Sequence, residues 1–283
     1  MRIEIEPGVR LFVDVDGPGL VADGEAMRQR PTVLVLHGGP GMDHTTLKPA
    51  VSALVDVAQI IYYDHRSQGR SDPRPRDEWT LDVWADDVVR LCDALGVERP
   101  VVIGNSFGGF VAQRYLGRHP DHAAGVVLSS TAARFDVDPI LDAFERLGGS
   151  GARAVAQRFW AAPGADTLPE YAAVCFPLYN PTPASDPLAA GRVVLNLELM
   201  AAFFDEWPDL DLREDLARAA RPVLVLAGGL DPVCPPVAAA EIVAALPQDL
   251  VSYELFEGAG HGVFRDQPDR AFDRIRSFIA ELG

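Results

Sequence analysis

The stretch that decides the fold is Val101-Val102-Ile103-Gly104-Asn105-Ser106-Phe107-Gly108-Gly109-Phe110-Val111-Ala112-Gln113-Arg114-Tyr115. A short apolar run, typical of a buried strand, ends at Gly104, and apolar residues at helical spacing follow the glycines. Ser106 lies between them in the pattern Gly-x-Ser-x-Gly, a nucleophile elbow that holds a hydroxyl above the end of a parallel sheet. Larger side chains in place of Gly104 and Gly108 would collide with neighbouring backbone. The sequence therefore predicts Ser106 as a nucleophile, and the alternative is a serine in an ordinary glycine-rich turn.

Apolar runs of the length of buried strands lie on both sides of this elbow, and helical patterns separate them. Strands that alternate with helices predict an α/β fold with a mostly parallel, doubly wound sheet covered on both faces. Strands are expected at 2–6, 9–15, 31–36, 58–63, 101–103, 125–130, 221–227 and 250–256, the first two as a hairpin. Helices are expected near 44–56, 80–95, 237–246 and 267–281 and directly after the elbow, and residues 16–30 are expected to form a loop.

The segment 132–212 interrupts this alternation, since it has no strand-like run and contains many prolines and large aromatic residues. We interpret it as a helical cap inserted after the sixth strand, between the core segments 1–131 and 213–283. Most of its aromatic side chains are expected to form a small core of the cap itself. They are Phe159, Trp160, Tyr171, Phe176, Tyr179, Phe203, Phe204 and Trp207.

Two further polar residues follow strands later in the chain. Asp231 comes four residues after a buried strand, and His261 comes five residues after the next one. Because the carboxyl ends of strands share one edge of a doubly wound sheet, we expect both side chains to meet Ser106 there. A serine hydroxyl needs a base to take its proton and an acid to orient that base, so the three residues predict a catalytic triad. Taken singly, Asp231 could be a turn aspartate before proline and His261 an ordinary loop histidine.

The oxyanion formed by attack on a carbonyl needs preorganised donors. One is expected to be the backbone N–H of Phe107, and the other to come from the loop His37-Gly38-Gly39-Pro40-Gly41, where Gly38 and Gly39 allow close approach of a substrate. That loop must also make a tight turn between strand and helix. No metal-ligand spacing and no phosphate-binding loop competes, so no metal and no cofactor are expected. A serine at position 106 favours acyl transfer to water, whereas an aspartate would favour dehalogenase or epoxide hydrolase chemistry.

The composition restricts the class of partner. The chain of 283 residues has 41 acidic and 25 basic side chains and a formal net charge of −16, which argues against nucleic acid and anionic membranes. The three cysteines are far apart in the sequence, and neither a signal peptide nor a membrane-spanning run is recognisable. We therefore expect a cytoplasmic protein that acts on a small molecule or short peptide. The sequence leaves the oligomeric state open.

With these residues in place, the chain resembles the α/β-hydrolases and, in detail, the proline iminopeptidases. The resemblance rests on the first glycine loop, on the elbow, on Asp64-His65-Arg66 through Gly69-Arg70-Ser71 and on Gly229-Leu230-Asp231-Pro232-Val233-Cys234-Pro235. It implies that Gly39 and Phe107 form the oxyanion hole and that cap glutamates bind a substrate amine. Glu198 is the first candidate for that role and Glu206 the second. Glu198 is equally readable as the solvent face of a cap helix.

The chain also departs from this family. It has Phe107 where the family usually has tryptophan, and Ser67 where the family has glycine. The same motifs occur in relatives that cleave esters, lactones or carbon–carbon bonds. The resemblance therefore implies, as the first hypothesis, a serine aminopeptidase that releases an N-terminal proline. An esterase or lactonase stands beside it as an alternative, and a ligand-binding protein without catalysis stands as a third.

Overall fold

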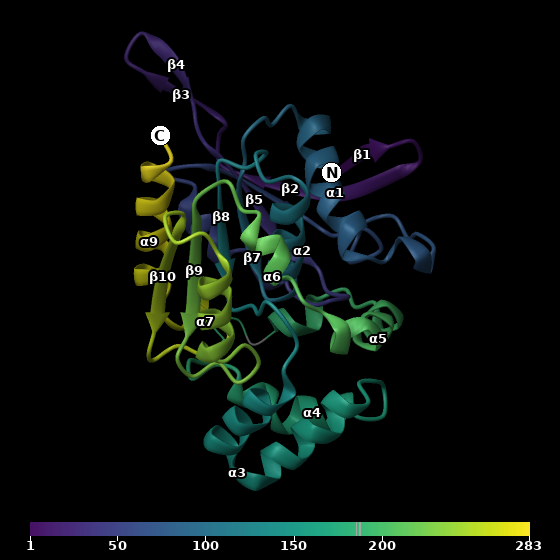
Figure 1. The fold of residues 1–283 in the computed structure, drawn as a ribbon. Helices are drawn as coiled ribbons and strands as arrows, with labels where there is room; N and C mark the ends of the chain where they lie inside the picture. Colours follow the sequence, from purple (N-terminus) through teal and green to yellow (C-terminus); the bar gives the residue numbers. More distant parts are fainter. Residues whose placement is uncertain (185, 187) are drawn as a thin grey trace.

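One sheet of eight strands forms the centre of the protein (Figure 1). The computed structural model describes residues 1–184, 186 and 188–283, without the side chains of residues 205, 206 and 208. The sheet order is β1-β2-β6-β5-β7-β8-β9-β10. Strands β1 and β2 are antiparallel to their neighbours, and the pairs from β6 to β10 are parallel. The bounds are β1 Arg2–Glu6, β2 Val9–Asp16, β5 Thr32–Leu36, β6 Gln59–Tyr63, β7 Val101–Asn105, β8 Gly125–Ser129, β9 Val223–Gly228 and β10 Val251–Phe256. The prediction of a mostly parallel sheet with an opening hairpin is confirmed.

Helices cover both faces of the sheet, since alternate residues of a strand are apolar and belong to different hydrophobic clusters, one on each face. Leu34 and Leu36 of β5 pack with α1, α2 and α7, whereas Val33 and Val35 pack with α9 on the other face. The expected N-cap of α1 is present, since Thr80 Oγ1 accepts a hydrogen bond from the backbone N–H of Val83 at 3.2 Å. The helices of the core are α1 Leu81–Leu95, α2 Phe107–Arg118, α6 Arg213–Ala217, α7 Pro236–Ala245, α8 Val263–Asp266 and α9 Pro268–Glu281.

Two segments differ from the expectation. Residues 16–30, expected as a loop, contain the hairpin of β3 (Leu20–Asp23) and β4 (Ala26–Gln29). This hairpin projects from the molecule at the end opposite the helices α3 (Val137–Ala161) and α4 (Leu168–Val174) (Figure 1). Its two-residue turn is Gly24-Glu25, and Gly24 has φ 62°, as expected for the glycine at the first central position of a tight hairpin turn.

The helix expected over 44–56 is replaced by two short 3₁₀ helices, η1 (His44–Thr46) and η2 (Ala50–Leu54). Pro49 lies between them. Proline lacks an N–H and disfavours a helical conformation at the preceding residue, so a continuous α-helix cannot pass through this point.

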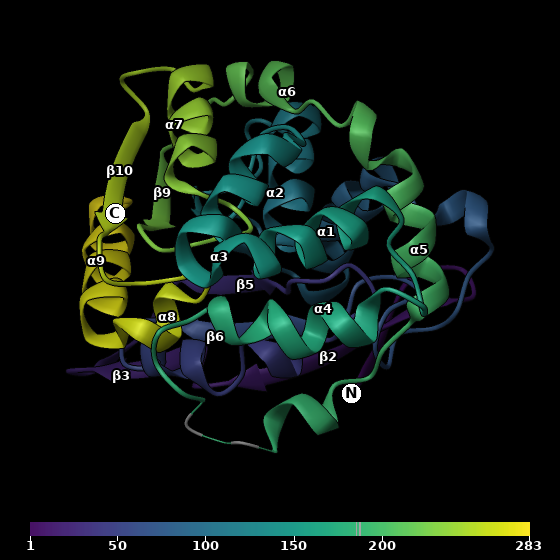
Figure 2. The same ribbon diagram turned by 90° about the horizontal axis from the view of Figure 1, so that it is seen from below.

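The segment between β8 and β9 is helical in the structure. It contains α3 (Val137–Ala161), α4 (Leu168–Val174), η4 (Phe176–Leu178), η5 (Ala189–Arg192), α5 (Leu197–Glu206) and η6 (Trp207–Asp209). Figure 2 shows α3 and α4 lying across the end of the core. The start and the end of this segment are hydrogen-bonded to each other. Arg134 forms a β-bridge with Asp211, and the Leu212 N–H donates to the carbonyl oxygen of Ala133 at 2.7 Å. In the part of the chain described, no helix has both the length and the apolar character needed to cross a membrane.

Candidate active site

Ser106 lies at the tight turn between β7 and α2. Its backbone has φ 53° and ψ −117°, and its N–H donates to the carbonyl oxygen of Ser129 on the neighbouring strand at 3.0 Å. A Cβ atom on Gly104 would lie 2.5 Å from the carbonyl oxygen of Gly108, and one on Gly108 would lie 2.1 Å from that of Leu36. The collisions expected of larger residues at these two positions are therefore present. The elbow holds Ser106 in a strained conformation that few residues adopt.

The structure brings Ser106, His261 and Asp231 together. Ser106 Oγ lies 3.1 Å from His261 Nε2, and His261 Nδ1 lies 2.8 Å from Asp231 Oδ2. With its proton on Nδ1, the imidazole donates to the carboxylate and offers the lone pair of Nε2 to the serine hydroxyl. This arrangement can take a proton from Ser106 as the hydroxyl attacks a carbonyl carbon.

The turn after β9 holds Asp231 in place. Its Oδ1 accepts hydrogen bonds from the backbone N–H groups of Val233 at 2.8 Å and Cys234 at 2.9 Å, and the side chain is fully buried. Oδ2 therefore remains the oxygen that faces His261. A carboxylate held by two amides and one imidazole is satisfied at both oxygens, which fixes the orientation of the histidine ring.

The inserted segment supports the other side of the histidine. Tyr179 accepts the backbone N–H of His261 on its carbonyl oxygen at 2.7 Å, and Asn180 Oδ1 accepts the N–H of Gly262 at 2.7 Å. A Cβ atom on Gly260 would lie 2.0 Å from the Tyr179 carbonyl oxygen, so the two segments are in close contact there. The loop that carries His261 is thus held by residues between α4 and α5.

Cys234 completes a group of potential metal ligands with Asp231 and His261, whose ligand atoms lie within 4.8 Å of one another. In the structure, however, Nδ1 and Oδ2 are bonded to each other. Burial, together with the charge of Asp231, raises the pKa of the Cys234 thiol well above its usual value, which keeps the sulfur protonated. A thiol must lose its proton to bind a metal, so the arrangement of these three residues suits proton transfer better than metal binding.

The glycine loop lies next to the serine. Gly38 and Gly39 line the same cavity as Ser106, and neither Gly39 nor Phe107 has a hydrogen-bond partner for its backbone N–H among the described residues. The ring of Phe107 is fully buried and packs edge-on against His65, Trp84 and Phe203. Both backbone amides are therefore available to a substrate oxygen. The packing of the Phe107 ring holds the amide of this residue in place.

His37 fixes the backbone of the glycine loop. Its Nδ1 donates to the carbonyl oxygen of Gly38 at 2.7 Å, and its Nε2 accepts the backbone N–H of His65 at 3.1 Å. These partners assign the proton to Nδ1. Burial lowers the pKa of His37, and burial with the nearby His37 ring lowers that of His65 well below its usual value. Both rings are neutral and serve to position the loop.

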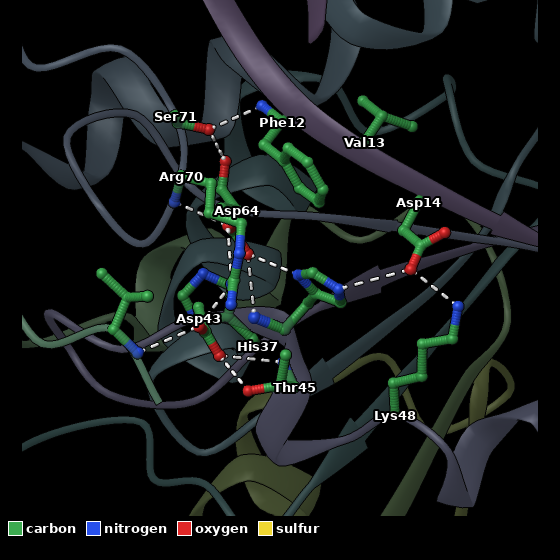
Figure 3. A network of polar contacts seen from close by, with 12 residues as sticks. Phe12, Val13, Asp14, His37, Asp43, Thr45, Lys48, Asp64, Arg70 and Ser71 are labelled. Carbon is green, nitrogen blue, oxygen red and sulfur yellow. Dashed lines mark hydrogen bonds and ion pairs between the residues drawn. The ribbon is translucent and has the colours of Figure 1, made fainter. Parts of the chain in front are cut away.

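Two buried aspartates anchor the chain that follows the glycine loop (Figure 3). Asp43 accepts hydrogen bonds from Thr45 N–H at 3.0 Å and Arg70 at 2.6 Å, and Asp64 accepts from the Arg70 N–H at 2.8 Å. Asp64 also accepts both the backbone and the Nδ1 of His44, at 2.9 and 2.6 Å. Burial alone would raise the pKa of each carboxyl, but these hydrogen bonds and charges outweigh it and lower both pKa values. Both groups are carboxylates at neutral pH.

The cavity above Ser106 has a volume of about 400 Å³. It is lined by residues of the glycine loop, by Ser106 and His261, and by helices of the inserted segment. Seven of the eight aromatic residues expected to form a separate cap core line it, namely Phe159, Trp160, Tyr171, Phe176, Tyr179, Phe204 and Trp207. Five of them also form the expected small core of the inserted segment, since Phe159 and Tyr171 belong to a hydrophobic cluster of that segment and Trp160, Tyr179 and Phe204 pack against it. The expectation is confirmed for these five, and their side chains line the cavity as well. Phe203 alone turns away, onto Phe107 and Trp84.

Of the two glutamates expected to bind an amine, Glu198 does not line this cavity. Glu198 is exposed and lines a different cavity, between α4 and α5. Glu206 is the last residue of α5, and its side chain lies outside the described residues. The buried residues Leu199 and Phe203 face the core, so Glu198 falls on the outer side of the helix. Among the described side chains that line the Ser106 cavity, no carboxylate is present.

Several residues of the site were not found from the sequence. Thr131 Oγ1 donates to the carbonyl oxygen of Ser106 at 2.9 Å, and Asn196 bonds to the glycine loop. Thr131 follows β8 at the same edge of the sheet as Ser106, so its position after a buried strand was a usable signal. The role of Asn196 had no comparable signal, because it depends on how α5 lies on the core.

Comparison with known proteins places this site in a family. The model of the alpha/beta hydrolase fold matches residues 31–268. The chain belongs to this family. It is 27% identical over 285 residues to the proline iminopeptidase PfmaB of Pestalotiopsis fici, covering 95% of this chain and 98% of that protein.

Two solved structures are also similar to this α/β-hydrolase. The proline iminopeptidase of Mycobacterium smegmatis superposes with a TM-score of 0.78 at 23% identity, over 100% of this chain and 98% of the other. A thermophilic esterase from Thermogutta terrifontis superposes with a TM-score of 0.69 at 26% identity, over 100% and 98%. The first of these likenesses supports the fold alone. The resemblance to proline iminopeptidases that the motifs predicted is confirmed at the level of the family.

Proposed function

We propose that this protein is a serine hydrolase that cleaves carboxylic esters with an uncharged, mainly apolar acyl group. The observation that carries the proposal is the bonded chain from Ser106 through His261 to Asp231, which opens onto an aromatic-lined cavity. An apolar pocket with a few convergent polar groups is the usual form of a small-molecule site.

In the proposed mechanism, Ser106 Oγ attacks the ester carbonyl while His261 Nε2 takes its proton. The backbone N–H groups of Gly39 and Phe107 stabilise the oxyanion of the tetrahedral intermediate. His261 then gives its proton to the departing alcohol, which leaves an acyl group on Ser106. Water, activated by the same histidine, releases the acid and restores the serine.

The charges around the cavity favour a neutral substrate over a cationic one. Arg265 lines the cavity and donates to the Thr182 carbonyl oxygen at 2.7 Å, while Glu198 lies outside. A protonated amine placed near the guanidinium, without a carboxylate as partner, would lose hydration and gain no compensating ion pair. The described lining residues therefore suit an ester better than the free amino end of a peptide.

A prolyl aminopeptidase is the second candidate. It is favoured by the 27% identity to the proline iminopeptidase of Pestalotiopsis fici over nearly the whole chain. The same triad would cleave the amide after an N-terminal proline, and the aromatic rings would contact the pyrrolidine. In this case Glu206 is the carboxylate that remains to be tested by substitution.

The deciding experiment compares a short-chain aryl ester with a proline arylamide, using the wild type and Ser106→Ala. Ester turnover that is lost in the variant, without arylamide turnover, is the expected result. Arylamide turnover that depends on Ser106 would instead establish the aminopeptidase, and Glu206→Gln would then be expected to raise KM. Turnover of neither substrate, or turnover that survives in the variant, would contradict both proposals.

A further inference from the structure

A second cavity of about 230 Å³ lies beside the one that contains Ser106. It lies where the start of α4 and the first turns of α5 come together below the core (Figure 2). Its lining is almost entirely apolar, and Glu198 is the one charged side chain among the described residues that form it. The other lining residues are Phe159, Pro163, Gly164, Ala165, Leu168, Leu197, Met200, Ala201 and Phe204.

The two cavities share a wall. Phe159, Leu168, Met200 and Phe204 line both of them, so the same side chains separate the catalytic cavity from the outer one. Phe159 is buried, whereas the other three are half-buried. Met200 is unbranched and has several rotatable bonds, which makes it the member of the wall that can move aside at least cost.

We propose that the outer cavity receives the far end of a long acyl chain whose carbonyl lies at Ser106, with Met200 as the residue that sets how far the chain extends. This inference rests on the proposed esterase function and adds the class of substrate. A hydrocarbon tail suits a lining of this composition because its burial removes apolar surface from water on both sides. A carboxylate at the far end of the tail would meet Glu198, so the preferred tail ends in an uncharged group.

The test uses p-nitrophenyl butyrate and p-nitrophenyl dodecanoate, and its readout is the ratio of kcat/KM for the long ester to that for the short one. Met200→Ala removes part of the wall and is expected to raise this ratio about tenfold, the effect of burying roughly two further methylene groups. Ala201→Trp fills the outer cavity from its exposed side and is expected to lower the ratio by a similar factor.

Met42→Ala is the matched control, since Met42 is also half-buried but lines only the Ser106 cavity. It enlarges the inner cavity without opening the wall, so its ratio should stay below that of Met200→Ala. Equal ratios in Met200→Ala, Ala201→Trp and the wild type would overturn the inference while leaving the esterase proposal intact. Wild-type protein that cleaves neither ester would overturn both.

Discussion

The backbone N–H of Asn196 donates to the carbonyl oxygen of Gly41 across 2.8 Å, which ties the start of α5 to the glycine loop beside Ser106. The Asn196 side chain makes two more bonds, from Nδ2 to the Ser67 carbonyl oxygen at 2.9 Å and from the Leu199 N–H to Oδ1 at 3.1 Å. One residue therefore joins the helix that covers the cavity to two loops of the core.

Replacing Asn196 should loosen this connection. Asn196→Ala removes the N-cap of α5 and the bond to Ser67, so we expect a loss of about 1–2 kcal/mol in the free energy of unfolding and a larger KM. Asn196→Asp keeps the capping oxygen and loses only the donor to Ser67, so its stability should lie between those of the wild type and Asn196→Ala. Chemical denaturation and steady-state kinetics measure both effects. Identical stability of the two variants would show that the cap contributes nothing.

Asp231→Asn tests the orientation of His261. The amide oxygen is expected to keep the N–H groups of Val233 and Cys234, which turns the amide NH₂ toward His261 Nδ1. The ring must then carry its proton on Nε2, where it cannot accept the proton of Ser106. We expect kcat to fall about ten-thousand-fold with little change in KM, as for such substitutions in other triads. A variant that keeps more than a tenth of wild-type kcat would contradict this role.

Gly108→Ala tests the packing of the elbow. The added Cβ would lie 2.1 Å from the Leu36 carbonyl oxygen, which is backbone in a central strand and has little freedom to move. We expect a loss of at least about 3 kcal/mol in the free energy of unfolding, or no folded protein. Gly151→Ala is the control, because Gly151 is exposed, lies in the first turn after the kink of α3 at Gly149, and has nothing within 4 Å of an added Cβ, so we expect a change within about 0.5 kcal/mol. Thermal unfolding of both variants gives the comparison.

The buried histidines predict a pH dependence of stability. The folded pKa values of His37 and His65 lie below the ordinary 6.5, so the unfolded chain binds protons that the folded chain does not. Their contribution is complete above pH 6.5 and is lost as the pH falls below it, by up to about 1.4 kcal/mol per pH unit for each ring.

The matched variant for this effect is His65→Leu. Among the described residues, neither ring nitrogen of His65 has a hydrogen-bond partner, so a leucine of similar size should be accommodated in the fold, and the variant should lose stability less steeply in acid. Unfolding in denaturant at pH 7.0 and at pH 5.5 measures how much free energy of unfolding each protein loses between these two pH values. Equal losses in the wild type and the variant would show that His65 does not contribute.

The sequence predicted the sheet and the positions of Ser106, Asp231 and His261 because parallel strands place their carboxyl ends at one edge. This rule needs only the ends of apolar runs, and those are visible in the chain. The 3₁₀ turns around Pro49 were missed because the helix was expected only from the length of chain between the two flanking strands, although the proline was a sufficient warning.

The side chains of α5 could not be assigned in the same way, because the face that a helix presents depends on its partner. Leu199 and Phe203 are spaced by four residues and are buried, which places Glu198 outside. That spacing was a signal for the buried face, and it would have argued against Glu198 as an amine-binding residue. A prediction of which aromatic residues reach the cavity would have required knowledge of how α3, α4 and α5 pack together.

The contact of Tyr179 and Asn180 with the loop of His261 and Gly262 has a consequence for exchanging parts between enzymes of this fold. Segments that cover such sites are attractive units for grafting, since they carry most of the residues that face a substrate. In this chain a graft must keep Tyr179 and Asn180 in the same backbone conformation. Otherwise the loop that carries His261 loses two of the hydrogen bonds that hold it. Chimeras that keep Tyr179 and Asn180 and exchange only the residues on either side should therefore retain more turnover than chimeras that replace this dipeptide.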